Sequence, residues 1–243
     1  MHRLVVGDST DQAVASKLMR EEKADMCFTD PPYGVAVNTG SLKDLKARNR
    51  RLDGAVVDND AMKPAEFKAF LLRAFGVMNS SMKDGGAAYI CHAEALGMDV
   101  IFRTAFAESG FKPAEIIIWV KDVFVFGRQD YHWRHEPIIY GWKEGAAHYF
   151  SSDRTQDTVW EFPRPKKSEN HPTIKPADLS IKAIQNSSRL GEIVFDGFVG
   201  SGTTLVACEV TGRRGRAIEL APKYAAVTLQ RLADMELAPV LSE

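Results

Sequence analysis

A short segment near the N-terminus, Thr29-Asp30-Pro31-Pro32-Tyr33-Gly34, has the residue types needed to hold and orient an amino group. It directly follows residues 25–29, which read as a strand. The Asp30 carboxylate can accept one hydrogen bond from an NH2 group. The Pro31 carbonyl can accept the other, because two successive prolines fix the backbone and supply no competing N–H donors. Tyr33 adds a flat aromatic face. The predicted catalytic residues are therefore Asp30, Pro31, Pro32 and Tyr33.

A second segment, near the C-terminus, has the features of a nucleotide-type cofactor site. Asp196 directly follows a predicted strand, and Gly200-Ser201-Gly202 then turns the chain into a helix. Glycines let a ligand approach the backbone closely, and the N–H groups at a helix start attract negative groups. Glu219 ends the next strand about 20 positions after Gly200, where nucleotide-binding sheets carry an acidic residue for the ribose hydroxyls. A GxGxxG pattern is absent because Leu205 stands at the third glycine, and no lysine follows as in a P-loop.

Strand and helix signals alternate along the chain, which predicts a mostly parallel sheet with helices on both faces. The predicted strands are 3–6, 25–29, 87–91, 115–120, 137–142, 193–195 and 216–220, and the predicted helices are 10–22, 64–83, 94–109, 176–189, 203–210 and one that begins at 222. Residues 34–62 and 121–172 show the least periodicity. Loops on such a scaffold carry function, so we expect the substrate-contacting insertions there.

Composition bounds the class of protein. The chain has 243 residues, 45% of them hydrophobic and 26% charged, which suits one α/β domain over residues 1–243. No apolar run approaches the roughly 18–20 residues of a membrane span, and residues 1–4 lack the apolar core of a signal peptide. We therefore expect a cytoplasmic protein. The three cysteines sit in apolar stretches without a CxxC pair, so we expect buried thiols and no metal site.

The charge is balanced overall but uneven along the chain. Net charge is −1, which argues against a uniformly basic surface. Basic residues nevertheless gather in three places, namely Lys43, Lys46, Arg48, Arg50 and Arg51, then Arg164, Lys166 and Lys167, and finally Arg213, Arg214 and Arg216. A solvated face and a local phosphate-contacting patch both remain open as interpretations.

Both chemical segments resemble motifs of one enzyme family. Residues 196–204, DGFVGSGTT, resemble the DPFxGSGTT motif of S-adenosylmethionine-dependent DNA methyltransferases, with Gly197 at the usual proline and Val199 at a usual small residue. Residues 171–176, HPTIKP, resemble the segment that precedes this motif in the permuted (beta-type) amino-group DNA methyltransferases. In that group, as here, the DPPY segment comes first. The resemblance implies a Rossmann-like methyltransferase fold with a mostly parallel seven-stranded sheet and a circularly permuted motif order.

The resemblance also implies a cofactor and the residues that hold it. The cofactor would be S-adenosyl-L-methionine. Asp8, at the end of the first strand, would accept from its adenine amine, Asp196 would face the methionine ammonium, and Glu219 would bind the ribose. Thr173 and Lys175 would lie near the methionine carboxylate. The remaining implied cofactor-binding residues are Phe198, Gly200, Ser201, Gly202 and Thr203.

The substrate implied by the resemblance is double-stranded DNA. The DPPY motif most often accompanies transfer to adenine N6, and SPPY or SPPW to cytosine N4, so we expect a site-specific adenine-N6 methyltransferase acting on a flipped base. Cytosine-N4 transfer and a non-catalytic DNA-binding accessory role are the alternatives. Members of the group are bacterial or phage-encoded and often dimerise, so the resemblance implies a DNA-associated homodimer.

Two further regions are candidates for contact with the substrate. Residues 133–141, WRHEPIIYG, look like a segment that lies near the target base in the same group, so Trp133, His135 and Glu136 are candidate base-pocket residues. The alternative is an ordinary packed aromatic strand entry. His132 and His135 lack an HExxH frame, which argues against a metal there. Arg48 and Arg51 have side chains able to read base edges and are candidate DNA contacts.

Overall fold

The computed structural model describes residues 1–34, 62–94, 97–126, 130–164 and 175–241. Eight strands form one sheet in the order β1-β8-β7-β2-β3-β5-β4-β6. Their bounds are β1 Arg3–Val6, β2 Ala24–Thr29, β3 Met82–Cys91, β4 Phe111–Val125, β5 Trp133–Lys143, β6 Val159–Glu161, β7 Ile193–Asp196 and β8 Arg214–Glu219. The predicted residues Arg48, Arg51 and Thr173 lie outside the described ranges.

The direction of the strands determines where the predicted catalytic and cofactor-binding residues lie. β1, β8, β7, β2 and β3 run parallel to one another, whereas β5 is antiparallel to both β3 and β4, and β6 pairs parallel with β4. Parallel strands bring their carboxyl ends to one edge of the sheet, and ligands of open α/β sheets bind outside that edge. Asp30, Asp196 and Glu219 stand at the carboxyl ends of β2, β7 and β8, so the sheet gathers them.

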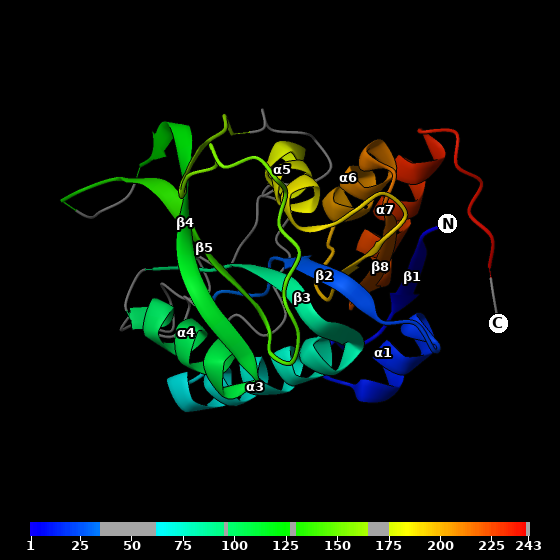
Figure 1. The fold of residues 1–243 in the computed structure, drawn as a ribbon, viewed down its shortest axis with the longest axis horizontal. Helices are drawn as coiled ribbons and strands as arrows, with labels where there is room; N and C mark the ends of the chain where they lie inside the picture. Colours follow the sequence, from blue (N-terminus) through cyan, green and yellow to red (C-terminus); the bar gives the residue numbers. More distant parts are fainter. Residues whose placement is uncertain (35–61, 95–96, 127–129, 165–174, 242–243) are drawn as a thin grey trace.

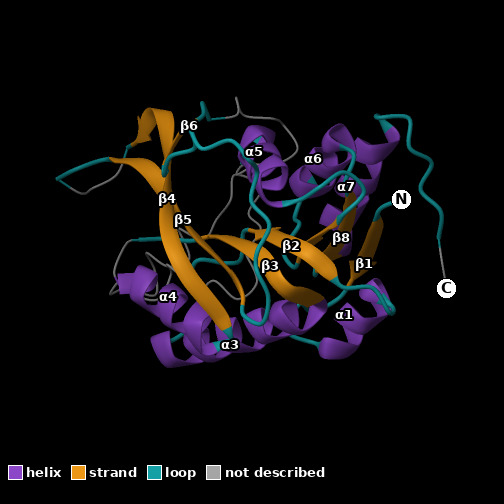
Figure 2. Ribbon diagram, viewed as in Figure 1, coloured by secondary structure: helices purple, strands orange, loops and turns teal. Residues whose placement is uncertain are grey.

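Helices cover both faces of the sheet, as expected. α1 (Gln12–Met19), α3 (Pro64–Ser81) and α4 (Met98–Glu108) lie along one face, at the bottom of Figure 1. α5 (Ala177–Ser187), α6 (Thr203–Thr211) and α7 (Pro222–Ala233) lie on the other face. Figure 2 shows the sheet passing between these two helical layers. The mostly parallel α/β sandwich predicted from the alternating signals is therefore confirmed.

The alternation of side chains along the central strands builds a core on each side of the sheet. Ala88 and Ile90 of β3 pack toward α3 and α4, in a cluster rich in phenylalanine. Tyr89 and Cys91, their neighbours on the same strand, point the other way, toward α5 and α6. The three cysteines, Cys27, Cys91 and Cys208, are free and fully buried, as their apolar surroundings predicted.

The sheet differs from the prediction in its far half. It has eight strands among the described residues rather than seven, because the short strand β6 pairs with β4 and carries no periodicity that sequence can show. β4 continues through residues 121–125, and β5 already begins at Trp133. The predicted insertion 121–172 therefore starts inside the sheet. Pairing between β4 and β5, not local pattern, extends both strands.

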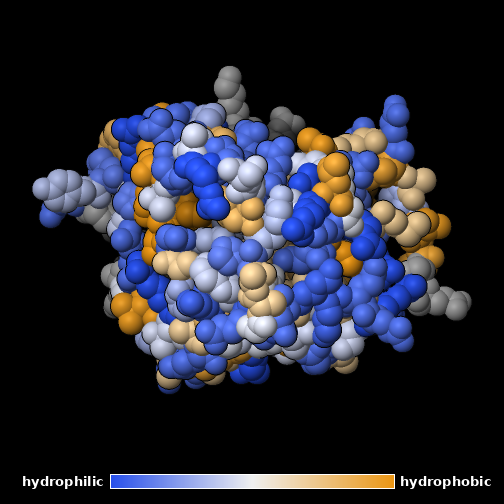
Figure 3. All heavy atoms as spheres, viewed as in Figure 1, coloured by the Kyte–Doolittle hydropathy of each residue, from blue (hydrophilic) through white to orange (hydrophobic). Residues whose placement is uncertain are grey.

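One face of the molecule is shown with all its atoms in Figure 3. Over the face seen in Figure 3, hydrophilic residues cover most of the area, and apolar residues lie between them. None of the helices in the described residues has the length and apolarity to cross a membrane.

One half-buried ion-pair cluster ties the sheet to the turn after its first helix and yields a stability prediction. Glu22 Oε2 lies 2.6 Å from Arg216, which is 2% exposed, and Glu22 Oε1 lies 2.7 Å from Arg214. Hydrogen bonding to Arg216, opposed by burial, lowers the pKa of Glu22 to about 2. We expect Glu22→Gln to lower the free energy of unfolding at pH 7 by about 1–3 kcal/mol, because a buried guanidinium loses its carboxylate.

The pH dependence gives the control for this prediction. A carboxyl whose pKa is lowered in the folded state stabilises the fold above its ordinary pKa of 4.5, and that contribution is lost as pH falls toward about 2. The difference in unfolding free energy between wild type and Glu22→Gln, measured with urea, should therefore be largest at pH 7, smaller at pH 3 and absent only below about pH 2. The exposed neighbour Glu21→Gln should match wild type at both values. A Glu22→Gln difference independent of pH would contradict the assignment.

Candidate active site

The predicted catalytic and cofactor segments are joined by a direct contact. Thr29, the last residue of β2, donates from its hydroxyl to Asp196 Oδ1 at 2.6 Å, and the backbone N–H of Phe198 donates to the same oxygen at 2.9 Å. Thr29 and Asp196 are almost completely buried. β2 and β7 are adjacent and parallel. Because of this link, the position of the Asp30 turn is tied to the Gly-rich loop.

Burial dominates the electrostatics of Asp196. The side chain lies under the loop, and this burial raises the pKa of its carboxyl to about 6, although hydrogen bonds from Thr204 and Thr29 act in the opposite direction. A carboxylate with so little solvent around it favours any cation that can reach it. This is the charge expected of a group that receives a ligand ammonium.

The Gly-rich loop leaves open space beside its backbone. Gly200 has φ +56°, and no other atom lies within 4 Å of the place where a Cβ would stand. Its N–H donates to Glu219 Oε2 at 2.9 Å, while Ala221 donates to Glu219 Oε1, also at 2.9 Å. A carboxylate is also an acceptor for ligand hydroxyls. Gly200 and Glu219 therefore frame a space suited to a ribose.

Close packing explains the second glycine of the loop. Gly202 has φ +86° and precedes α6, and a Cβ there would lie 2.6 Å from the Thr228 side chain of α7. Thr228 in turn donates from its hydroxyl to the Gly200 carbonyl at 3.0 Å. The Ser201 carbonyl accepts from Arg231 at 2.6 Å. Hydrogen bonds from α7 therefore hold the loop in place. Helix α6 begins at Thr203, as predicted.

The remaining described cofactor candidates lie around this loop. Asp8 is exposed at the end of β1, where Gly7 donates its N–H to the Glu219 carbonyl at 3.0 Å. Phe198 is half-buried, with its ring centroid 6.0 Å from that of Phe70 on α3. Both residues are at the carboxyl edge of the sheet, Asp8 after β1 and Phe198 within the Gly-rich loop itself. Their contacts with a cofactor stay predictions.

A compact hydrogen-bonded cluster surrounds Asp30. Tyr33 donates from its hydroxyl to Asp30 Oδ1 at 2.8 Å. Lys175 donates from Nζ to Asp30 Oδ2 at 2.5 Å and to the Tyr33 hydroxyl at 2.7 Å. Glu136 Oε2 lies 3.4 Å from Lys175 Nζ and 3.3 Å from the Tyr33 hydroxyl. Four side chains from three separate parts of the chain therefore meet at one point.

The charges in this cluster stabilise one another. Burial by itself would lower the pKa of Lys175, but the carboxylates of Asp30 and Glu136 raise it above its ordinary value. Burial would raise the pKa of Glu136, but Lys175 and Lys121 lower it. Burial, with Asp30 and Glu136 nearby, raises the pKa of Tyr33. The cluster therefore holds a charged lysine, a charged Glu136 and a neutral phenol.

Three sequence predictions about this region need comment. The structure places the Lys175 ammonium on Asp30 and Tyr33, and its predicted position near the methionine carboxylate stays a prediction. Trp133 and His135 were predicted in the base pocket together with Glu136. Only Glu136 reaches the cluster, because successive strand residues face opposite ways. His135 Nε2 instead lies 2.9 Å from Glu94, and the Trp133 ring packs against His135.

Two residues of the site escaped the sequence analysis. Thr29 was taken only as the end of a strand, yet its hydroxyl joins the two motifs. Lys121, buried on β4, pairs with Glu136 at 2.6 Å. A signal for Lys121 existed, because it continues the alternation of the inward-facing positions Ile117 and Trp119. The predicted strand ends at Val120, one residue before Lys121.

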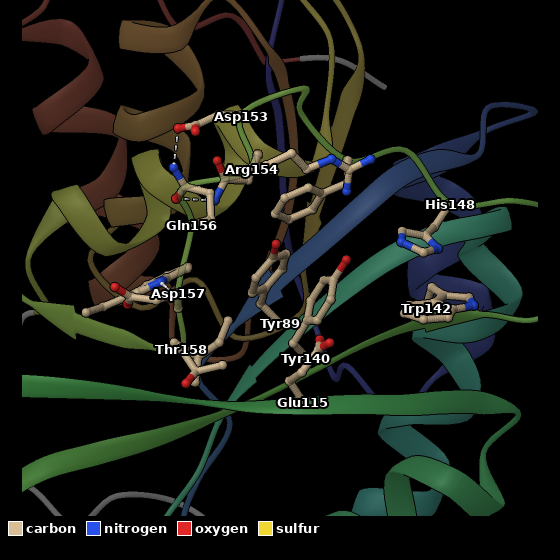
Figure 4. A pocket seen from close by; sticks show the side chains of 14 residues that line it. Tyr89, Glu115, Tyr140, Trp142, His148, Asp153, Arg154, Gln156, Asp157 and Thr158 are labelled. Carbon is tan, nitrogen blue, oxygen red and sulfur yellow. Dashed lines mark hydrogen bonds between the residues drawn. The ribbon is translucent and has the colours of Figure 1, made fainter.

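A separate cavity of about 390 Å³ lies on the face of the sheet that α5 and α6 cover. Figure 4 shows Tyr89 and Tyr140 rising from β3 and β5 toward the segment that carries Asp153 and Gln156. None of the predicted catalytic or cofactor residues lines it. The chemistry belongs to the carboxyl edge of the sheet, not to this cavity. Within the described part of the chain, no three His, Cys, Asp or Glu side chains are grouped to hold a metal ion.

Comparison with known proteins agrees with this geometry. A family model described as DNA methylase (N6_N4_Mtase) matches residues 24–230, which include the Asp30 cluster and the whole Gly-rich loop. The chain belongs to this DNA methylase family. It is 26% identical to the DNA adenine methyltransferase YhdJ of Escherichia coli (strain K12) over 255 residues, covering 91% of this chain and 80% of that protein.

Solved structures of DNA methylases share the fold. The crystal structure of the M1.HpyAVI–SAM complex superposes with a TM-score of 0.68 at 22% identity, covering 95% of this chain and 100% of that one. PvuII DNA methyltransferase, which is cytosine-N4-specific, superposes with a TM-score of 0.70 at 16% identity, and the match covers 98% of this chain and 88% of that one. The expected Rossmann-like methyltransferase fold is confirmed, with the catalytic strand before the cofactor strand.

Proposed function

We propose that this DNA methylase transfers a methyl group from S-adenosyl-L-methionine to the exocyclic N6 of adenine in double-stranded DNA. The observation that carries the proposal is the placement of Asp30 at the end of β2, beside a Gly-rich loop to which Thr29 ties it at 2.6 Å. A carboxylate that can hold an amine thus stands next to a loop suited to the cofactor. The Asp30-Pro31-Pro32-Tyr33 motif and the adenine methyltransferase YhdJ support adenine.

The residues at the loop fit the cofactor. Open space lies beside Gly200, the buried carboxylate of Asp196 suits the methionine ammonium, and the Glu219 carboxylate beside Gly200 suits the ribose hydroxyls. Asp8 and Phe198, at the same edge of the sheet, would lie beside the adenine ring. When bound, S-adenosylmethionine would supply an electrophilic methyl group, whose bond to sulfur breaks as the N–C bond forms, with S-adenosylhomocysteine as the leaving group. M1.HpyAVI, which shares the fold, forms a SAM complex, and this supports the assignment.

Asp30 and its neighbours would act on the incoming amine. Each Asp30 oxygen already accepts one hydrogen bond, from Tyr33 or Lys175, and has a second lone pair for an adenine N–H. The Pro31 carbonyl would accept the other N–H and so direct the nitrogen lone pair toward the methyl group. Positive charge develops on N6 as the N–C bond forms, and the fixed carboxylate stabilises it. The surplus N6 proton then leaves through Asp30 to solvent.

Tyr33 would stack on the flipped base. Its ring packs edge-on against the ring of Phe102, with 6.3 Å between the ring centroids. Its hydroxyl is hydrogen-bonded to Lys175 and Asp30. An aromatic ring held in this way offers a prepared face to a base that has left the helix. Flipping costs a few kcal/mol, and stacking on an aromatic side chain returns about 1–3 kcal/mol.

Transfer to cytosine N4 is the second candidate, because the cytosine-N4-specific PvuII enzyme shares the fold. Incubation with unmethylated genomic DNA and S-adenosylmethionine, followed by nucleoside mass spectrometry, tests both. We expect N6-methyladenine. N4-methylcytosine would overturn the base assignment and keep the mechanism. Cofactor binding without any methylated base would favour the accessory role.

We further infer a DNA-associated homodimer in the bacterial cytoplasm, with Arg48, Arg51 and the region 121–172 contacting DNA. The hairpin of β4 and β5 supports a contact there, because it projects beyond the body of the sheet and carries exposed Phe126 and Tyr131 near its tip. Phosphate contacts would weaken steeply with added salt. Sedimentation velocity with and without duplex DNA measures the subunit number, and a monomer in both would overturn the dimer.

A further inference from the structure

A chain of alternating charges runs from inside the sheet to Asp30. Lys121 Nζ lies 2.6 Å from Oε1 of Glu136, and Oε2 of Glu136 lies 3.4 Å from Lys175 Nζ. Lys175 Nζ lies 2.5 Å from Asp30 Oδ2. The two ammonium groups and two carboxylates balance, so the cluster is neutral as a whole. Lys121 is the end of this chain that is furthest from the reacting amine.

The burial of Lys121 calls for an explanation. The residue is 5% exposed and lies on the inward face of β4, with its ammonium 5.2 Å from the centroid of the Trp119 ring. Burying an ammonium is unfavourable unless it is paired, and an apolar residue would pack there at lower cost. Among the described residues, Glu136 is its one ion-pair partner. The charge of Lys121 is therefore best understood through what it does to Glu136.

Glu136 is shared between two lysines, and this sharing fixes the cluster. The short contact is with Lys121 at 2.6 Å and the long one is with Lys175 at 3.4 Å. Without Lys121, Glu136 would draw Lys175 away from Asp30. Because Lys175 also donates to the Tyr33 hydroxyl at 2.7 Å, the same movement would release Tyr33. Both groups that hold Asp30 would then shift.

We propose that Lys121 is a positioning residue for methyl transfer: by holding Glu136, it keeps Lys175 and Tyr33 on Asp30 in the arrangement that receives the target amine. The inference rests on the proposed function and assigns Lys121 no contact with base or cofactor. A displacement of about 1 Å from the reactive geometry can cost on the order of a hundredfold in rate. Lys121 thus affects the chemical step from two side chains away.

Removal of Lys121 should also change the pH dependence. Burial raises the pKa of Glu136, whereas Lys175 and Lys121 lower it, so loss of Lys121 would raise it. Glu136 would then take up a proton at higher pH and release Lys175. The charged and titratable groups that face Glu136 are Lys121 on β4, Lys175 before α5, Asp30 and Tyr33 after β2, and Cys91 on β3. The acidic limb of the kcat profile should move to higher pH.

The test compares Lys121→Met with Lys112→Met, an exposed lysine on the same strand that lies over the Trp142 ring. In Lys121→Met we expect kcat to fall about 10–100-fold, with KM for DNA and Kd for S-adenosylmethionine close to wild type. Lys121→Arg should recover part of kcat and return the pH profile toward wild type. Lys112→Met should leave kcat, KM and the pH profile unchanged. An unchanged kcat and pH profile in folded Lys121→Met would overturn the proposal, as would an equal loss in Lys112→Met.

A double variant allows the proposal to be tested even if the loss of one buried charge in Lys121→Met impairs folding. Lys121→Met/Glu136→Gln removes one buried charge of each sign. Since Lys121 acts through Glu136, the double variant should lose no more activity than Glu136→Gln alone, whereas two independent losses would contradict the mechanism.

A measurement without turnover separates this inference from the proposed function. ¹³C NMR of the Glu136 carboxyl, assigned with Glu136→Gln, should show a higher titration midpoint in Lys121→Met than in wild type. An unchanged midpoint would overturn the inference even in an enzyme that makes N6-methyladenine. A wild type that methylates no DNA base, combined with the shifted midpoint, would overturn the function and leave the charge coupling standing.

Discussion

Replacing Asp30 with alanine should abolish methyl transfer while cofactor binding persists. The carboxylate is the acceptor for the target amine and the fixed charge that opposes the positive charge developing on N6. Loss of one such preorganised group lowers kcat by about a hundredfold to a thousandfold, and Asp30 also anchors Tyr33 and Lys175, so we expect the upper end of that range or beyond. Asp196 keeps its hydrogen bond from Thr29 in the variant, so the cofactor loop retains its support.

The measurements are single-turnover methylation of duplex DNA and calorimetric titration with S-adenosylmethionine. Asp30→Asn should retain more activity than Asp30→Ala, because the amide oxygen still accepts one hydrogen bond. Asp234→Ala removes an exposed aspartate at the end of α7 and should behave as wild type in both assays. An Asp30→Ala protein that loses cofactor affinity and kcat in equal proportion would contradict a purely catalytic role.

The sequence predicted the carboxyl edge of the sheet well because its signals are local. Asp30 and Asp196 each stand where a β-strand ends. A proline-rich turn follows at Asp30 and a glycine-rich turn follows at Asp196, and the sequence of such a turn is enough to predict it. The order of strands then brings the two aspartates together, since β2 and β7 are parallel neighbours. A reader of the sequence could therefore name Asp30, Asp196 and Glu219 without knowing any distance between them.

The rest of the site depends on contacts between distant parts of the chain. Lys121 looked like the first residue of a loop, and only pairing of β4 with β5 extends the strand and turns its side chain toward Glu136. Trp133 and His135 shared a motif with Glu136, yet alternation along β5 sends them to the other face. Lys175 follows a proline-containing segment whose sequence does not indicate where the lysine side chain points. Its position on Asp30 comes from packing ahead of α5.

Cofactor affinity should fall in acid because of Asp196. Burial raises the pKa of this carboxyl to about 6 in the free protein. Only its ionised form attracts the methionine ammonium, so protonation competes with binding as pH falls through 6. The ammonium itself stays protonated between pH 5 and 7, since α-amino groups have pKa values of about 7.7–8.0. Linkage then makes Kd for S-adenosylmethionine at pH 5 about tenfold higher than its plateau value at neutral pH.

The variant Asp196→Asn isolates this effect. It should raise Kd at pH 7 by about thirtyfold or more, because a buried charge pair is worth 2 kcal/mol upward. It should also make Kd nearly independent of pH between 5 and 7, because the titrating group is gone. Asp30→Ala serves as the matched control, since it removes a carboxylate from the same edge of the sheet and should retain the wild-type slope. A wild-type Kd that stays level from pH 7 to 5 would show that Asp196 does not hold the ammonium, and would leave the ionic contact to another carboxylate at the same edge of the sheet.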